Sequence, residues 1–305
     1  MLLGMSRHFI GLRKTYEVLI SDITLKYNTF CTMSDIKSNV TGVPLNQVVD
    51  TLKQFADLSL AGSWDNVGLL VEPTETKLVS HILLTNDLTE TVMQEALDLK
   101  IDMIITYHPL IFDPIKSITT CSWKGKIIAK CLENRIAVYS PHTSFDSIRG
   151  GVNDWLASAF EKVLESSIPI QPDATNNNGY GRMCTLKNEI SIEEAVQLVK
   201  QRTGLKYVRL ARTHLKDGSI KTVALCAGAG VSVLENVSAD LYLTGEMLHH
   251  DVLNATHKGI NVILTNHSDS ERGFLKTFAP ILNKLLNKSV YVQVSKNDAD
   301  PLKTV

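Results

Sequence analysis

Short apolar runs alternate with helical patterns along most of this chain, and this alternation limits its fold more than any other feature of the sequence. The helical patterns carry apolar residues three and four positions apart, as Leu45, Val48 and Leu52 do. A strand, a helix and a second strand in succession form a βαβ unit, whose strands lie parallel in one sheet. The sequence therefore predicts an α/β fold, with strands at 82–85, 103–106, 137–139, 207–210, 223–226, 241–243 and 262–264 and helices at 45–55, 92–99, 127–132 and 192–200.

A polar, turn-rich stretch interrupts this rhythm near the middle of the chain. It contains Pro169, Pro172 and three consecutive asparagines at 176–178, which favour turns over helices or strands. The length of 305 residues also exceeds the usual size of one domain. We therefore expect two similar α/β domains with mostly parallel sheets, the first at 44–165 and the second at 181–305, joined by a linker at 166–180.

The two expected domains repeat one pattern of polar residues at strand ends. Residues 101–108 and 239–246 each contain an apolar strand led by an aspartate. Residues 140–146 and 265–271 then each place a histidine after an apolar strand and a carboxylate four residues later. Two βαβ units share the rhythm of strands and helices through fold physics alone, but that rhythm does not explain metal-capable residues at matching strand ends. The pattern favours a diverged duplication.

Composition and charge exclude several classes of protein. Hydrophobic residues make up 44% of the chain and charged residues 21%, which is ordinary for a folded protein in water. The formal net charge of -1 supplies no broad basic surface, so we expect no direct binding to nucleic acid. No apolar run reaches the length of about 18 residues that a membrane span needs. The five cysteines are widely spaced without a CxxC pair, which indicates reduced thiols.

The first 43 residues form an extension that lacks the later periodicity. Arg7, Arg13 and Lys14 lie among apolar and hydroxyl residues before Met33, a composition typical of mitochondrial targeting segments. Glu17 and Asp22 count against targeting, because such segments are poor in acidic residues. Two interpretations of residues 1–33 stay open: a targeting segment, or a disordered and peripheral extension of a protein of the cytoplasm and nucleus.

Three histidines, His108, His142 and His267, each follow an apolar strand directly. The carboxyl ends of parallel strands are where ligands bind in open α/β sheets. A single half-buried histidine is more often a hydrogen-bonded structural residue, but three at strand ends, two of them with a carboxylate four residues on, favour a metal site. Imidazole and carboxylate donors without thiolates suit Zn, Mn or Fe(II) in an open site with room for water.

A helix that began near Glu246 would place Glu246 and His250 on one face. The two residues would then be metal ligands, partners of the ligands or a proton relay. A solvated helix start, with Glu246 favoured by the helix dipole, explains the pair equally well. Gly228 and Gly230 follow a strand and could cradle an anion, although glycine turns alone are weak evidence.

Several short motifs occur in a fixed order along the chain. They are S-W-D-N-V-G-L-L at 63–70, Y-H-P at 107–109, S-P-H-T at 140–143 with Asp146, L-T-G-E at 243–246 with His249 and His250, and His267 with Glu271 and Arg272. Together they resemble the NGG-one-interacting-factor-three-like family, also called the GTP cyclohydrolase 1 type 2 family, from about residue 44 to the end of the chain. The short linker is similar to that of animal-type members, which lack an inserted middle domain.

The resemblance implies a dinuclear metal site between the two domains, in a protein that forms homodimers or larger homo-oligomers. Carried over position by position, the metal ligands would be His108, Asp146, His267 and Glu271, and the catalytic residues beside them would be Glu246, His250 and His142. Many relatives have a second histidine where this chain has Tyr107. The resemblance therefore implies one or two divalent ions (Zn, Mn or Fe), with Tyr107 weakening the second site.

Two classes of function follow from the resemblance, and both stay open. An open metal site implies a metal-dependent hydrolase, whose substrate the motifs do not name. Animal members resemble proteins described as partners of transcriptional regulators, which implies a partner-binding corepressor. An enzyme needs the ligands and a pocket, whereas a corepressor needs an exposed apolar patch and would survive loss of the ligands.

Overall fold

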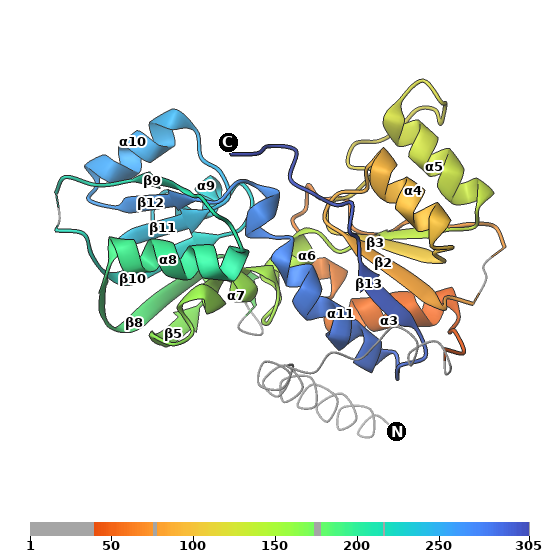
Figure 1. The fold of residues 1–305 in the computed structure, drawn as a ribbon, viewed down its shortest axis with the longest axis horizontal. Helices are drawn as coiled ribbons and strands as arrows, with labels where there is room; N and C mark the ends of the chain where they lie inside the picture. Colours follow the sequence, from red (N-terminus) through yellow and green to blue (C-terminus); the bar gives the residue numbers. More distant parts are fainter. Residues whose placement is uncertain (1–39, 76–77, 174–177, 216, 305) are drawn as a thin grey trace.

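Two mixed sheets carry the fold, one in each half of the molecule (Figure 1). They are seen in a computed structural model that describes residues 40–75, 78–173, 178–215 and 217–304. The segment at 1–33, for which targeting or disorder was expected, lies outside these residues. Within them, no helix is both long and apolar enough to cross a membrane.

The first sheet has five strands in the order β1-β4-β3-β2-β13. Strands β13, β2, β3 and β4 run parallel to one another, and β1 runs antiparallel to β4 at one edge. The strands span Gly68–Val71 (β1), His81–Thr85 (β2), Met103–Thr106 (β3), Ala137–Ser140 (β4) and Tyr291–Val294 (β13).

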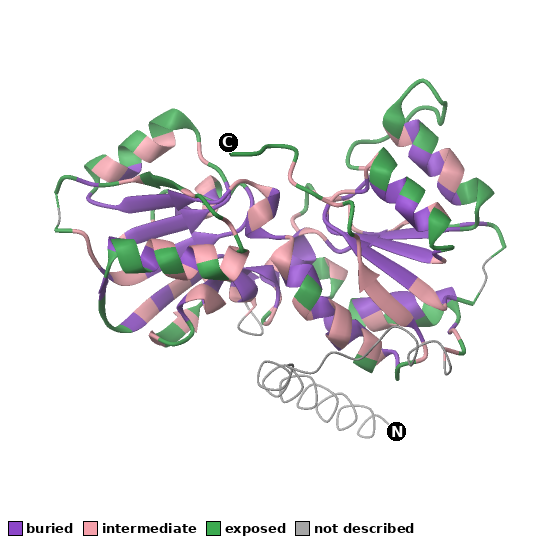
Figure 2. Ribbon diagram, viewed as in Figure 1, coloured by how far each residue is buried: buried purple, intermediate pink, exposed green. Residues whose placement is uncertain are grey.

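Helices cover both faces of the first sheet (Figure 1). Leu83 and Ile104 pack with α4 and α5 on one face, while their neighbours Ile82 and Ile105 belong to the core on the side of α3 and α11. Because both faces are covered, the central strands β3 and β4 are buried along their length, as Figure 2 shows. The helices of this half are α3 (Leu45–Phe55), α4 (Glu90–Asp98), α5 (Trp123–Glu133), α6 (Thr143–Ser147) and α11 (Gly273–Leu285), with a short turn, η1, at Leu58–Leu60.

The second sheet has six strands in the order β5-β8-β10-β11-β12-β9. Strands β10, β11 and β12 are parallel, and β8 and β9 flank them in the antiparallel direction. The strands span Leu164–Ile168 (β5), Arg182–Ser191 (β8), Arg209–Ala211 (β9), Ser219–Cys226 (β10), Leu241–Thr244 (β11) and Asn261–Leu264 (β12), and a separate ladder joins β6 (Gln171–Pro172) to β7 (Gly179–Tyr180).

Helices also cover both faces of the second sheet. Residues of α7 and α8 share the large core with Val223 and Leu243, whereas α9 and α10 pack over Ala224 and Tyr242 on the opposite face. The helical elements of this half are α7 (Val152–Ala157), η2 (Ser158–Phe160), α8 (Ile192–Thr203), α9 (Val231–Leu234), α10 (His249–His257) and η3 (Ser268–Ser270).

Several of the longer helices begin at a side chain that satisfies a free backbone N–H group. Thr89, Ser122 and Ser191 each accept a hydrogen bond from the N–H three residues ahead, at the starts of α4, α5 and α8. Helix α8 ends at Gly204, whose φ of +77° is costly for residues with a side chain. These caps explain why the helical patterns in the sequence begin and end where they do.

The strand order repeats between the halves. In each half three parallel strands follow one another in the chain and in space, β2-β3-β4 and β10-β11-β12, and an antiparallel strand, β1 or β9, pairs with the third. Asp102 and Asp240 each precede the second strand, and both accept backbone hydrogen bonds at the first. His142 and His267 therefore follow equivalent strands, as the duplication hypothesis predicts.

The chain finishes in the first half, which differs from the expected boundaries of 44–165 and 181–305. Strand β13 pairs with β2 of the first sheet, and Phe278 of α11 packs on Phe55 and Phe145, with ring centroids 5.1 Å and 4.8 Å away. Strand β5 pairs with β8 of the second sheet. The physical reason is that the open edge of β2 is covered by a strand from the far end of the chain.

Candidate metal centre

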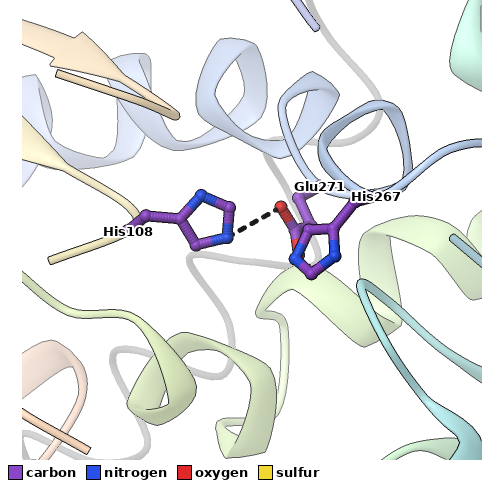
Figure 3. A group of neighbouring side chains, drawn as sticks. All are labelled: His108, His267 and Glu271. Carbon is purple, nitrogen blue, oxygen red and sulfur yellow. Dashed lines mark ion pairs between the residues drawn. The ribbon is translucent and has the colours of Figure 1, made fainter. Parts of the chain in front are cut away.

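His108, His267 and Glu271 gather where the two halves meet, and Figure 3 shows both imidazole rings turned towards the carboxylate. The Nε2 atom of His108 lies 3.4 Å from Oε2 of Glu271. The Nε2 atom of His267 lies 3.4 Å from the other oxygen, Oε1. One carboxylate thus lies between an imidazole of the first half and an imidazole of the second.

The ends of two parallel strands place these side chains. His108 lies two residues beyond β3 of the first sheet, and His267 lies three residues beyond β12 of the second. Asn266 takes a left-handed φ of +70° just before His267, a conformation that asparagine tolerates better than most residues. The turn η3 then brings Glu271 back beside His267. Both histidines thus lie just beyond the carboxyl ends of parallel strands, where the sequence predicts them.

A carboxylate holds the outer nitrogen of each histidine. The Nδ1 atom of His108 lies 2.9 Å from Asp87, and the Nδ1 atom of His267 lies 2.8 Å from Glu246. Metal-binding histidines usually have such a partner, which fixes the ring and makes the inner nitrogen more basic. Both Nε2 atoms are left to face Glu271.

Glu271 lies in a tight, buried setting. Its side chain is 3% exposed, and the side-chain amide of Asn86 donates to Oε2 at 3.1 Å. Gly228 faces it, and a Cβ atom at that position would lie 2.6 Å from Oε1 of Glu271 and 3.2 Å from Nε2 of His267. The space beside the three donor groups therefore exists only because residue 228 has no side chain.

The charges around His108 call for a cation. Burial by itself would lower the pKa of His108, but the hydrogen bonds and negative charges of Asp87 and Glu271 outweigh burial and raise it to about 10. Two anionic carboxylates next to one imidazole stabilise positive charge, whether a proton or a metal ion supplies it.

The donor set fits a divalent transition metal. Two ligand atoms about 2.1 Å from one tetrahedral ion lie about 3.4 Å apart, and both imidazole–carboxylate separations are 3.4 Å. Nitrogen and oxygen donors without a thiolate suit Zn, Mn or Fe(II). The thiol of Cys226, which is close enough to interact with Glu271, is buried, and burial raises its pKa far above the usual range, so it stays protonated.

Asp146, the fourth predicted ligand, points to a different partner. Its Oδ1 atom accepts a hydrogen bond from the hydroxyl of Tyr107 at 2.5 Å. Burial, together with the nearby charge of Glu271, raises the pKa of Asp146 to about 6 although this hydrogen bond opposes the rise. Tyr107 is also buried, and burial raises its pKa well above 10. The tyrosine hydroxyl thus occupies one of the two carboxylate oxygens of Asp146.

His142 lies beside the group and is held in place by Asp65. Its Nδ1 atom is 2.7 Å from Asp65, whose other oxygen accepts from the backbone and hydroxyl of Thr143. The His142 and His108 rings have centroids 5.3 Å apart. The backbone of His142 has φ +33° and ψ −119°, a costly conformation for a residue with a side chain. These contacts hold a strained histidine at the rim of the centre.

The expected helix start at Glu246 is wrong, because α10 begins at His249 with Leu248 as its cap. Glu246 therefore lies in the preceding turn, from which it reaches His267. His250 is exposed in the first turn of α10, with its ring 5.4 Å from that of His249. Glu246 and His250 do not share a helix face, because the turn at 245–248 separates them.

Sequence reasoning missed Asp87 and Asn86, which contact His108 and Glu271. The rule that selected the histidines could have found both, because they directly follow strand β2. Asp65 belonged to the motif at 63–70 but was given no role. Each of the three holds a predicted site residue by a hydrogen bond, which a pattern of apolar runs does not reveal.

We predict that replacing Asp87 with asparagine lowers the affinity for Zn or Mn by about 10- to 100-fold, the usual effect of removing a carboxylate that orients a histidine ligand. Titration against a competing chelator would measure the change. Asp98→Asn is a suitable control, because Asp98 is exposed at the end of α4 and accepts from Gln94. Equal affinities for Asp87→Asn and the control would contradict the role of Asp87.

Comparison with known proteins gives consistent results. A family model described as Duf34/NIF3 (NGG1p interacting factor 3) matches residues 43–301. NIF3-like protein 1 of Drosophila melanogaster is 48% identical over 267 residues, which cover 87% of this chain and 90% of that protein. NGG1-interacting factor 3 of Saccharomyces cerevisiae is 36% identical over 284 residues, which cover 86% of this chain and 98% of that protein.

Solved structures show the same fold. A Bacillus cereus protein related to NIF3 has a TM-score of 0.76 at 22% identity, covering 86% of this chain and 99% of that one. Reduced HcgD from Methanocaldococcus jannaschii has a TM-score of 0.72 at 27% identity, covering 84% and 99%. The family model spans most of the described residues, and the relatives match over nearly their whole length. The chain belongs to the Duf34/NIF3 family.

Proposed function

We propose that this protein is a divalent-metal-dependent hydrolase whose ion is held by His108, His267 and Glu271. One observation carries the proposal: imidazoles from the two halves aim their Nε2 atoms at the two oxygens of one buried carboxylate. Buried carboxylates are rarely left among neutral groups without a compensating charge. An ion shared by the halves would supply that charge.

Zn, Mn and Fe(II) are the ions that this donor set suits, since it offers nitrogen and oxygen atoms only. Bound there, such an ion would act as a Lewis acid that polarises a substrate oxygen and lowers the pKa of water. The outer carboxylates of Asp87 and Glu246 contact the Nδ1 atoms of the two imidazoles, which turns each Nε2 atom towards the place of the ion. Gly228 leaves the open space in which a substrate oxygen would lie.

We propose that His142 moves the proton in this reaction. Its Nδ1 atom is tied to Asp65, so its Nε2 atom is free to accept or donate a proton beside the centre. Glu246 is half exposed, and it orients the ring of His267 by its contact with Nδ1. A relay through His250 stays a prediction from the family resemblance.

We predict that Tyr107→His raises the metal content from one ion per chain towards two. The substitution removes the hydroxyl that occupies Oδ1 of Asp146 and adds an imidazole next to it. Elemental analysis after loading with Mn would measure the content. Tyr107→Phe is the control, because it removes the hydroxyl without adding a ligand and should stay at one ion. An unchanged content in Tyr107→His would show that Tyr107 does not limit the second site.

Hydrolase activity can be tested directly on the metal-loaded protein. A panel of phosphoesters and nucleotides should include a substrate whose turnover needs the metal and is restored by adding it back. Glu271→Gln should lose that turnover. Turnover that survives both chelation and Glu271→Gln would refute the proposal.

A partner-binding role is the second candidate, and the name of the yeast relative, NGG1-interacting factor 3, favours it. Such a corepressor would bind a transcriptional regulator through an exposed apolar surface. Glu271→Gln separates the two roles, because it should abolish turnover and leave partner binding intact. We also propose, on family resemblance alone, that the chain forms a homodimer or a larger homo-oligomer.

A further inference from the structure

We propose that Trp64 and Phe112 form a binding site for a flat aromatic ring, so that the substrate of the proposed hydrolase is an anionic compound carrying such a ring. This inference rests on the proposed function, because the metal would bind the anionic group. It adds the chemical class of the substrate.

The rings of Trp64, Phe112 and His142 lie together at the rim of the metal centre. The ring centroids of Trp64 and Phe112 lie 6.1 Å and 6.4 Å from that of His142, and 6.1 Å from each other. Both rings stand nearly perpendicular to the imidazole, at 81° and 80°, and are tilted by 56° to one another. Both rings therefore make an edge contact with the imidazole of His142.

The side chains of Trp64 and Phe112 are exposed, whereas that of His142 is mostly buried. Trp64 is 65% exposed and Phe112 is 41% exposed, while the side chain of His142 is only 14% exposed. Large aromatic side chains usually bury most of their surface. Two of them left open beside a histidine of the centre offer ring faces to a ligand.

Neighbouring residues hold Trp64 and Phe112 in their positions. A Cβ atom on Gly62 would lie 2.8 Å from Cε2 and Nε1 of Trp64, so the indole rests closely over this glycine. The side chain of Asn66 donates to the carbonyl of Ile111 at 2.6 Å, which ties the loop of Trp64 to the loop of Phe112. One edge of the indole is therefore fixed against the backbone.

The position of Trp64 and Phe112 next to the metal centre indicates the kind of ligand. The ring centroid of His108 lies 5.3 Å from that of His142 and 5.2 Å from that of His267, so a row of rings leads from the two aromatic residues to the centre. A ligand whose anionic group reached the metal would lay its next few atoms against the exposed faces of Trp64 and Phe112. Aromatic rings favour offset stacking or edge contact with other rings, so a planar ring suits these exposed faces better than an alkyl chain does.

The test compares phenylphosphonate with methylphosphonate, which share an anionic group and differ in the planar ring. Calorimetric titration of the Mn-loaded protein should give about tenfold tighter binding of phenylphosphonate, in the range of one aromatic stacking contact. Trp64→Ala should remove this preference and leave methylphosphonate binding unchanged. Gly62→Ala, which displaces the indole, should reduce the preference. Trp64→Phe should keep most of it.

Trp123→Ala is the matched control. Trp123 is 47% exposed at the start of α5, where its ring lies under Lys124, and its loss should leave both affinities unchanged. Equal binding of the two phosphonates by the parent protein, or a preference that survives in Trp64→Ala, would overturn the inference. A Trp64→Ala protein that dissociates from dimer to monomer would also overturn it, since Trp64 and Phe112 would then lie at an interface between copies. If the parent protein did not retain Mn during the titration, that result would count against the proposed metal centre rather than against the aromatic site.

Discussion

Replacing Glu271 with glutamine should lower the affinity of the protein for Zn or Mn by more than about 100-fold. Loss of a carboxylate that merely orients a ligand already costs about 10- to 100-fold, and Glu271 lies directly against both imidazoles. Glutamine has nearly the same shape, so the buried site keeps its packing. The protein should therefore stay folded while it loses the ion.

Metal content after dialysis and the apparent melting temperature would measure these two effects. The control is Glu235→Gln, because Glu235 is exposed at the end of α9 and far along the chain from the ligands. It should keep the metal content of the parent protein. A Glu271→Gln protein that holds as much metal as this control would show that the ion binds elsewhere.

Replacing Asp154 with alanine should destabilise the fold by about 3–5 kcal/mol. Arg182 is 2% exposed, and Asp154 accepts from its Nε and Nη2 atoms at 2.6 Å and 2.9 Å. The guanidinium also donates to the carbonyls of Gly179, Gly181 and Ile148. Without Asp154, a buried positive charge would have carbonyl dipoles but no anion to balance it.

The melting temperature should fall by about 10 °C, given about 2–4 °C per kcal/mol for a domain of this size. Glu193→Ala is the matched control, because its pair with Arg212 is as short, at 2.5 Å, but exposed. Exposed pairs contribute little to stability, so the control should melt with the parent protein. Similar melting temperatures for the two variants would contradict the importance of the Arg182 pair.

The parallel core of each sheet could be predicted from the sequence. Strands β3 and β4 are buried on both faces, so their apolar runs are continuous and have clear ends. The helices between them carry apolar residues at helical spacing and begin at capping residues such as Ser122. Local physics therefore determines these elements, and their positions in the structure agree with the prediction.

Strands β8 and β13 could not be predicted in the same way. Strand β8 contains Lys187, Asn188 and Glu189, which break its apolar alternation. Strand β13 has four residues, all half-buried, and it acquires its role only by pairing with β2 from the other end of the chain. Pairing across this distance leaves no local signal, which is why the expected domain boundary did not anticipate it.

The candidate site was predictable to a similar degree. His108, His267 and Glu271 were identified because they follow apolar strands and match family motifs, and the structure brings these three together. The hydrogen bond between Tyr107 and Asp146 depends on how β3 and α6 pack, and this contact has no counterpart in a strand pattern. The sequence could raise Tyr107 as a departure from the family but could not show which oxygen it occupies.

Anomalous diffraction from crystals loaded with Mn or Zn would test the central claim most directly. The account predicts an anomalous peak about 2.0–2.2 Å from Nε2 of His108, from Nε2 of His267 and from an oxygen of Glu271. The same peak should be missing from crystals of Glu271→Gln treated in the same way. A peak on other residues, or no peak among these three in protein that retains the metal in solution, would contradict it.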